Sequence, residues 1–215
     1  MWKKNKGYIA LTALITALPS LIGLLLWDRL PDSIPTHFNF QGVADGWSSK
    51  PFAVFALPAF MLIIHLICLA GTMADPRKQN IHTKIFRMVM WICPVVSLFT
   101  CGTIYLLALG MEVNMTHGVT VMMGLLFIIV GNYLPKCRQN YTVGIKLPWT
   151  LADTENWDRT HRFAGKLWVI CGIVVLFTPF LKSTGTWVMI ASFAVMILLP
   201  TGYSLLYYLK HQHDA

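Results

Sequence analysis

Charged side chains are scarce in this sequence, and acidic ones are the scarcest. Only 12% of the 215 residues are charged, with 9 acidic residues against 17 lysines and arginines, whereas 56% are hydrophobic and the mean hydropathy is +0.59. Such a composition excludes an ordinary soluble globular domain. Apolar runs of the roughly 20 residues that cross a bilayer as a helix occur at about 7–27, 51–74, 88–111, 113–135, 164–181 and 183–209. We therefore predict an all-α, polytopic integral membrane protein with six transmembrane helices, in which residues 1–215 form a single membrane domain.

The apolar runs also lack internal charges. None contains Asp, Glu, Lys or Arg away from its ends, which weighs against a proton- or sodium-coupled transporter, because such proteins carry ionisable groups along the ion path. A channel-like permeation path stays open as an alternative. His65 is the one ionisable side chain well inside a predicted helix. We expect it to be either a functional group of the bundle or, as is commoner, a neutral ring bonded to a neighbouring helix.

Cysteine is too sparse and too scattered for a disulfide framework. Four of the five cysteines fall within predicted helices and Cys137 falls in a predicted cytoplasmic loop, so we expect free thiols. The basic setting of Cys137 favours a lowered thiol pKa, with His161 as a candidate base. No further motif supports this enzyme reading. We predict no enzyme activity, no cofactor and no metal site.

The basic residues gather on one side of the predicted membrane. With a cytoplasmic N-terminus, three basic residues lie outside (Arg29, Lys50 and Lys182) and fourteen lie inside (Lys3, Lys4, Lys6, Arg77, Lys78, Lys84, Arg87, Lys136, Arg138, Lys146, Arg159, Arg162, Lys166 and Lys210). This asymmetry predicts that both termini are cytoplasmic. The excess positive charge is then explained by topology and by anionic membrane lipid, and we predict no nucleic-acid partner.

The outer loop at 28–50 is rich in proline and turn residues, which forbid a long helix. His37 lies between prolines and has Asp45 nearby in the sequence. Its ring could tie down the loop backbone, contact a peptide ligand or ligate a metal, although one histidine without a second His or Cys makes a poor zinc site. The loop therefore carries the candidate extracytoplasmic ligand contacts, His37, Phe38, Asn39, Gly42 and Asp45.

The inner segment at 131–166 is too long and too varied in composition for a simple connector. Asp153 is a candidate N-cap for a short helix from about Thr154, which would carry Trp157 and His161 on one face and lie along the membrane. The aromatic and basic side chains of the segment are typical either of a protein interface or of the lipid headgroup layer. Both readings stay open at this point.

Two ordered motifs can be read from these segments. The outer motif comprises Leu30-Pro31, Ile34-Pro35, His37-Phe38-Asn39, Gly42, Asp45 and Lys50. The inner motif comprises Gly131-Asn132, Pro135, Asn140, Gly144-Ile145, Pro148-Trp149-Thr150-Leu151, Trp157, Thr160-His161-Arg162 and Ala164-Gly165-Lys166. The inner motif resembles the signature of the SdpI-like family of bacterial membrane proteins, and the outer one resembles the domain of unknown function that precedes it.

The resemblance implies a multi-pass protein of the bacterial cytoplasmic (inner) membrane that recognises a secreted toxin peptide and gives immunity. It also implies possible signalling by capture of a cytoplasmic repressor protein. The chain departs from the family at Lys146-Leu147, where an Arg-Thr pair is usual, so a bidentate guanidinium is lost. A small transporter or permeation protein, or an intramembrane enzyme, are the alternatives. The candidate cytoplasmic motif is Asn132, Arg138, Asn140, Gly144, Lys146, Pro148, Trp149, Thr150, Trp157, His161 and Arg162.

Overall fold

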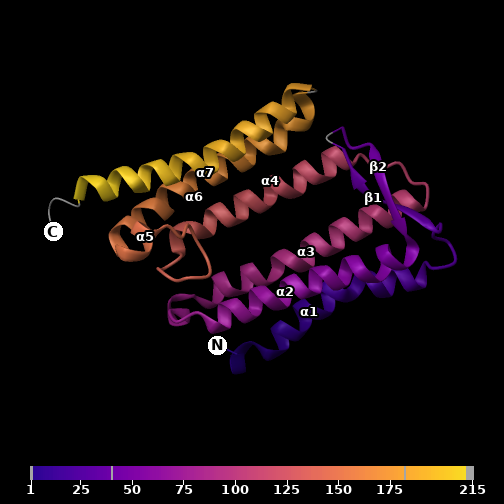
Figure 1. The fold of residues 1–215 in the computed structure, drawn as a ribbon, viewed down its shortest axis with the longest axis horizontal. Helices are drawn as coiled ribbons and strands as arrows, with labels where there is room; N and C mark the ends of the chain where they lie inside the picture. The colour runs from indigo at the N-terminus through magenta and orange to yellow at the C-terminus, as the bar shows by residue number, and fades with distance from the viewer. Residues whose placement is uncertain (1, 40, 182, 212–215) are drawn as a thin grey trace. The chain divides into compact units, whose positions relative to one another are not determined.

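The structure is a computed structural model that describes residues 2–39, 41–181 and 183–211 (Figure 1). Lys182, which the charge count assigned to the outer side, lies outside these residues, and the side chains of Lys3 and Lys4 are likewise not described. The chain forms two compact units. The first is Met1–Met73 with Phe86–Gly118, and the second is Ala74–Ile85 with Val119–Ala215.

The predicted set of membrane-spanning helices is confirmed. Six helices of the described chain are long and apolar enough to cross a membrane, over Asn5–Leu25, Phe52–Ala74, Thr83–Ala108, Met115–Lys136, Thr154–Leu181 and Thr184–His211. The helices are α1 (Trp2–Leu25), α2 (Leu57–Ala74), α3 (Thr83–Ala108), α4 (Met115–Tyr133), α5 (Pro148–Ala152), α6 (Thr154–Phe177) and α7 (Ser183–His211), with short turns η1 (Phe52–Ala56), η2 (Lys78–Asn80), η3 (Leu134–Lys136) and η4 (Thr178–Leu181).

The first unit also contains a β-hairpin that the all-α prediction did not include. Strands β1 (Ser33–Phe38) and β2 (Ala44–Ser49) pair antiparallel, with Ser33 opposite Ser49 and a bulge near His37. Figure 1 shows the hairpin at the end of the unit where α1 finishes and α2 follows. The hairpin forms because the prolines of the loop exclude a helix while permitting an edge strand. Gly42, at φ 78°, supplies the turn between the strands.

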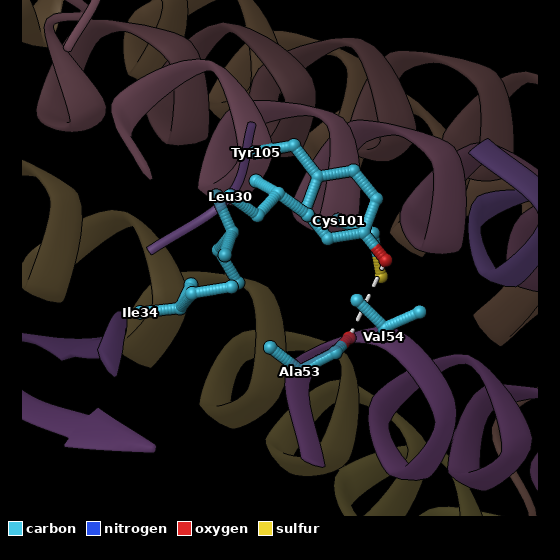
Figure 2. Packing of buried hydrophobic residues seen from close by; sticks show 7 residues of the cluster. Leu30, Ile34, Ala53, Val54, Cys101 and Tyr105 are labelled. Atoms are coloured by element: carbon cyan, nitrogen blue, oxygen red, sulfur yellow. Dashed lines mark hydrogen bonds between the residues drawn. The ribbon is translucent and has the colours of Figure 1, made fainter. Parts of the chain in front are cut away.

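The hairpin rests on a buried cluster within the same unit. Leu30 and Ile34 pack with Ala53, Val54, Cys101, Ile104 and Tyr105 (Figure 2). The Tyr105 hydroxyl has one proton and two carbonyl oxygens within reach, that of Pro19 at 3.1 Å and that of Ala53 at 3.4 Å. The hydroxyl therefore links the proline of α1 to the π-helical turn η1.

Paired glycines pack α4 against α6 in the second unit. A Cβ atom built on Gly124 would lie 2.9 Å from the Gly172 carbonyl, and one built on Gly131 would lie 2.9 Å from the Gly165 carbonyl. Because the numbers rise along one helix as they fall along the other, the helices are antiparallel at this contact. Small residues of this kind let two membrane helices approach closely.

Helix α6 differs from the predicted arrangement of this region. A short helix from about Thr154 was expected to lie along the membrane before running into the span at 164–181, whereas the structure has one continuous helix over Thr154–Phe177. The Asp153 side chain accepts a hydrogen bond from the Glu155 amide at 2.8 Å and caps the helix. No proline or glycine pair interrupts the helix after this cap, so the polar first turns continue into the apolar run.

Candidate functional site

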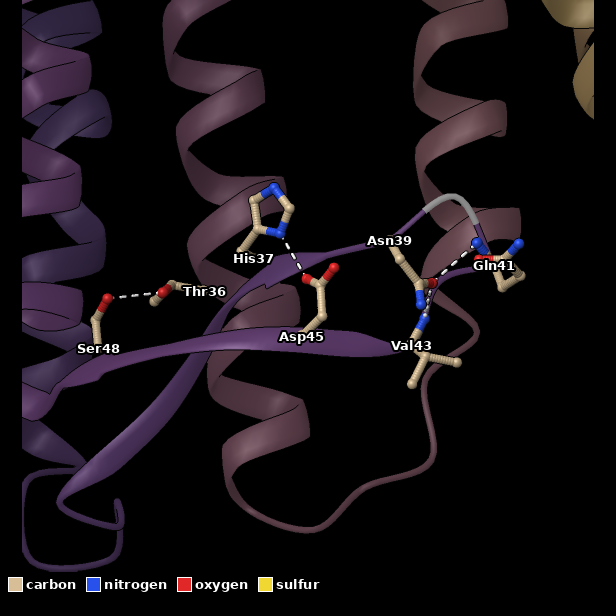
Figure 3. Close-up of polar contacts among 7 residues, drawn as sticks. All are labelled: Thr36, His37, Asn39, Gln41, Val43, Asp45 and Ser48. Carbon is tan, nitrogen blue, oxygen red and sulfur yellow. Dashed lines mark hydrogen bonds and ion pairs between the residues drawn. The ribbon is translucent and has the colours of Figure 1, made fainter.

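The hairpin holds the candidate ligand residues, and two of them, His37 and Asp45, form a hydrogen bond across it. The Nδ1 atom of His37 lies 2.5 Å from Oδ1 of Asp45, and the two side chains are 74% and 44% exposed (Figure 3). Nδ1 of His37 therefore bonds a carboxylate across the hairpin and not the loop backbone, which was one of the three roles considered for this ring. In the described part of the chain, no group of three or more metal-binding side chains lies close enough together to hold a metal ion.

The other predicted ligand residues build the hairpin. The Asn39 side-chain oxygen accepts hydrogen bonds from the Gln41 and Val43 amides, each at 3.0 Å, and so holds the turn (Figure 3). Phe38 packs on the buried cluster of the unit. A Cβ atom on Gly42 would lie 2.5 Å from the Thr116 hydroxyl oxygen, so this position has no room for a side chain.

Two exposed apolar side chains of the hairpin were missing from the predicted site. Val43 and Trp47 are 59% and 58% exposed. On β2, exposed Asp45 and Trp47 alternate with half-buried residues, as expected for one face of a strand. The hairpin therefore presents an aromatic ring, an aliphatic side chain and the His37–Asp45 pair. The sequence of β2, ADGWSS, does not alternate apolar and polar residues, so no local pattern predicted this exposed face.

A buried carboxylate joins two parts of the second unit. Asp75 accepts hydrogen bonds from the Thr142 hydroxyl at 2.6 Å, the Tyr141 amide at 2.9 Å and the Arg77 amide at 2.7 Å. Burial by itself raises the pKa of the Asp75 carboxyl, but these hydrogen bonds outweigh it and lower the pKa below the ordinary value. The sequence analysis used this loop only for its basic residues, as an indication of topology, and did not identify Asp75. Asp75 is the single acidic residue between Ala74 and Ile85.

Gln139 extends the connection that Asp75 begins. Its side-chain oxygen accepts from the Arg77 guanidinium and its backbone carbonyl accepts from the Asn80 amide at 2.7 Å. Its side-chain nitrogen donates to the Thr150 and Leu151 carbonyls at 2.8 and 2.9 Å. Asp75 and Gln139 together tie the loop before α3 to the segment before α6. We call this set of contacts the inner brace.

Four of the predicted motif residues stabilise the same segment, between the inner brace and the first turns of α6. The Asn140 side chain bonds the backbone of residues 138, 142 and 143 and so closes a turn. The Thr150 hydroxyl accepts from the Leu147 amide at 2.9 Å and lies 2.9 Å from the Ile145 carbonyl. The Trp157 indole donates to the Cys137 carbonyl at 2.7 Å, and its ring stacks on His161 at 4.0 Å. All four side chains are buried.

The hydrogen bonds of His161 define its tautomer. The Ile145 amide donates to Nε2 at 2.9 Å, so Nε2 carries no proton. Nδ1 then carries the proton and donates to the Trp157 carbonyl at 2.7 Å. Gly144, at φ 125°, passes directly over these rings, and a Cβ atom there would collide with the His161 Nε2 atom. His161 is therefore a buried structural group with both nitrogens occupied.

The geometry does not form the nucleophile and base considered for Cys137 and His161. Burial raises the pKa of the Cys137 thiol to about 11, so the expectation of a lowered pKa is wrong. The nearby positive charges do not compensate for the loss of water around the thiol. The only unprotonated nitrogen of His161 already accepts from the Ile145 amide. Neither group is available for proton transfer in this arrangement.

The remaining motif residues lie on or near the surface of the second unit. Asn132, Arg138, Lys146, Pro148 and Arg162 are exposed. Trp149 is half-buried and stacks on Tyr208 of α7, with ring centres 6.0 Å apart. The predicted cytoplasmic motif thus separates into a buried structural set and an exposed set, of which Arg138, Lys146 and Arg162 carry positive charge.

His65 occupies a separate buried site in the first unit. The Thr12 hydroxyl donates to the Ile9 carbonyl at 3.1 Å, which leaves its oxygen to accept from Nε2 of His65 at 3.2 Å. The other ring nitrogen, Nδ1, is buried and has no hydrogen-bond partner among the residues that the structure describes. The ring therefore bonds to a neighbouring helix, α1, which is one of the two roles considered for His65.

Comparison with known proteins agrees with the two motifs. Residues 136–204 match the SdpI/YfhL protein family and residues 14–62 match a domain of unknown function, DUF1648. The chain is 29% identical over 196 residues to the protein named Immunity protein SdpI of Bacillus subtilis (strain 168), covering 91% of this chain and 90% of that protein. No solved structure matches the chain with significance. The predicted family resemblance is confirmed.

Proposed function

We propose that this chain, which matches the SdpI/YfhL family over residues 136–204 and DUF1648 over residues 14–62, is an immunity protein that recognises a secreted toxin peptide. It acts in the bacterial cytoplasmic membrane, without catalysis. The observation that carries the proposal is the hairpin at residues 33–49, whose exposed side chains are of the kinds that bind peptides. In the topology predicted from the charge distribution, this hairpin faces the outside, where a secreted peptide arrives.

Recognition uses the exposed groups of the hairpin together. Trp47 and Val43 supply apolar contact area, and aromatic side chains commonly provide much of the binding energy of an interface. A two-stranded hairpin has two edges whose backbone groups can pair with an extended peptide. The His37–Asp45 pair supplies polar contacts, because Nδ1 of His37 is engaged by Asp45 while the other ring nitrogen points away (Figure 3).

The inner segment is the proposed output of the same protein. A peptide that binds one state of the bundle more tightly shifts the population toward that state. The exposed cations Arg138, Lys146 and Arg162 then supply a surface for a cytoplasmic regulator such as a repressor protein. The buried inner brace holds the backbone that presents these side chains. This output is a second step, and immunity by peptide capture does not depend on it.

A survival assay tests the proposal. A strain that lacks the gene is complemented with wild type, His37→Ala, Trp47→Ala or the control Trp187→Ala, and is challenged with the secreted peptides of its own and neighbouring strains. Trp187 is 72% exposed and lies on α7, which belongs to the second compact unit and not to the hairpin. We expect wild type and Trp187→Ala to protect equally, and the two hairpin variants to tolerate roughly ten-fold less peptide, as for loss of an interface anchor.

Two results would contradict the assignment. Equal survival of the deleted and complemented strains would remove immunity as the function. Full protection by both hairpin variants, at membrane levels equal to wild type, would leave immunity in place and remove the hairpin as its site.

A further inference from the structure

A basic cavity in the second unit shares only Arg138 with the surfaces used in the proposed function. It has a volume of about 470 Å³ and lies between the loop before α3 and the end of α4. The side chains that matter for its chemistry are Asn80, His82, Lys84, Tyr133, Lys136 and Arg138. All of them belong to one compact unit.

The cavity is suited to an anion because its charges are all of one sign. Lys84, Lys136 and Arg138 line it, and no acidic side chain does. Asp75, the acidic residue of the adjoining loop, does not line the cavity, and its oxygens accept hydrogen bonds within the inner brace. The structure records no ion pair between the three cations and any described carboxylate. Their charge is therefore available to a ligand.

The polar groups of the cavity are fixed before any ligand arrives. The Asn80 side chain donates to the Gln139 carbonyl at 2.7 Å, which joins the cavity wall to the inner brace. The Lys84 amide donates to Nδ1 of His82 at 3.2 Å, so the neutral ring carries its proton on Nε2, as a donor. The Lys136 ammonium lies over the Tyr133 ring, 5.0 Å from its centre. Groups held in place in this way lose little freedom on binding.

The depth of the cavity points to the source of the anion. Lys84 is the second residue of the span Thr83–Ala108, and Lys136 is the last residue of the span Met115–Lys136. Both therefore lie where helices leave the hydrocarbon, at the level of the lipid headgroups. Tyr133 and Ile85 add apolar surface to the lining. Basic pockets at this depth are typical binding sites for lipid headgroups.

We propose that this cavity binds the phosphate group of an anionic membrane lipid. Arg138 offers paired N–H donors to two phosphate oxygens, and the two ammonium groups neutralise its charge. Inorganic phosphate offers the same chemistry without acyl chains, and the experiment must separate the two sources. The site is separate from the hairpin, and it shares only Arg138 with the surface proposed for regulator capture, so lipid binding can be present if either of those functions is absent.

Lipid retention by the purified full-length protein tests the proposal. The protein is reconstituted in discs of phosphatidylcholine with or without phosphatidylglycerol, then extracted in mild detergent, and the lipid that stays bound is counted by mass spectrometry. The pocket variant is Lys84→Gln/Lys136→Gln/Arg138→Gln. The control, Lys78→Gln/Lys166→Gln/Lys210→Gln, removes equal charge from residues that do not line the cavity.

We expect wild type and control to retain phosphatidylglycerol, and the pocket variant to retain it at least about ten-fold less, because each basic group contributes to binding near the surface. If the triple variant does not purify as a single species, the single variants Lys136→Gln and Arg138→Gln replace it, and each is expected to retain less phosphatidylglycerol than wild type. Inorganic phosphate, added to discs of phosphatidylcholine alone, is expected to leave the melting temperature of wild type unchanged.

Two outcomes would overturn the proposal. Equal losses of phosphatidylglycerol from the pocket and control variants would show only general attraction between basic protein and anionic lipid. A rise in melting temperature with inorganic phosphate, lost in the pocket variant and without selective retention of phosphatidylglycerol, would assign the cavity to soluble phosphate.

Discussion

Single residues of the inner segment act mainly by satisfying buried backbone groups. Asn140 and Thr150 bond to carbonyls and amides of the turn that contains them, and Gln139 reaches the start of α5. Buried polar groups of this kind are costly when left without a partner. Their positions in the motif are therefore explained by the folding of a turn, and the exposed Arg138 and Lys146 are left for contacts with other molecules.

Gly144→Ala tests the close approach of the turn to His161. The new methyl group would both occupy a strained φ and collide with the His161 and Trp157 rings. We expect a loss of about 1–3 kcal/mol in the free energy of unfolding, measured by thermal unfolding in detergent. Gly110→Ala is the matched control, because its φ is also positive at 81° while nothing lies within 4 Å of the added atom. An equal loss of unfolding free energy in both variants would show that the strained φ, and not the collision with the rings, causes the effect.

The Asp75 carboxylate gives the second unit a stability that depends on pH. Since its pKa is lower in the folded protein, its contribution is present above the ordinary aspartate value of about 3.9 and is lost as the pH falls through the folded pKa. We expect the melting temperature of wild type to fall more steeply than that of Asp75→Asn below about pH 4. Asp158→Asn, at an exposed position of α6, removes one carboxylate outside the inner brace and is the control. Parallel curves for wild type and Asp75→Asn would contradict this role.

At the scale of helices, the packing of α4 on α6 is determined by paired glycines. A Cβ atom on Gly165 would lie 2.6 Å from the Pro135 ring and 2.7 Å from the Gly131 carbonyl. Neither the ring nor the helical carbonyl moves easily. A close contact between the two helices thus explains Gly131 and Gly165 of the motif. The sequence analysis had assigned these glycines no structural role.

Gly165→Ala should destabilise the protein, whereas Gly202→Ala should not. Gly165→Ala is expected to cost about 1–3 kcal/mol, as is typical of overpacking. Gly202 lies in α7 with nothing within 4 Å of an added Cβ, and alanine favours a helix over glycine by about 1 kcal/mol, so Gly202→Ala should be neutral or stabilising. Thermal unfolding of the two purified variants makes the comparison. Two stabilised variants would show that α4 and α6 are not in close contact.

The long helices were predictable from sequence, while the elements between them were only partly so. An apolar run of about 20 residues can cross a bilayer only as a helix, so helices such as α1 and α7 can be predicted from composition. The hairpin depends on contacts between residues far apart in the chain, such as Leu30 and Ile34 with Cys101. Likewise, the bond from Asp75 to Thr142 joins residues 67 positions apart, and no local pattern indicates it.

For the whole molecule, the two family segments fall on different compact units. The DUF1648 match at 14–62 lies within the first unit, and the SdpI/YfhL match at 136–204 lies within the second. The chain passes between the units three times, at Met73–Ala74, Ile85–Phe86 and Gly118–Val119, and each passage is inside a helix. A signal from the hairpin to the inner brace would therefore have continuous helices available as its covalent path.

The predicted topology requires the hairpin and the start of α6 to lie on opposite sides of the membrane. Cysteines are placed singly at Ser49 and Thr154, both exposed, in a variant without the five native cysteines. A membrane-impermeant maleimide should label Ser49→Cys in intact cells and Thr154→Cys only after permeabilisation, because fourteen of the seventeen basic residues are assigned to the cytoplasmic side. The cysteine-free variant gives the background. The reverse pattern would invert the protein in the membrane and would remove the hairpin from contact with a secreted peptide, whereas labelling of both sites in intact cells would contradict the six-helix path.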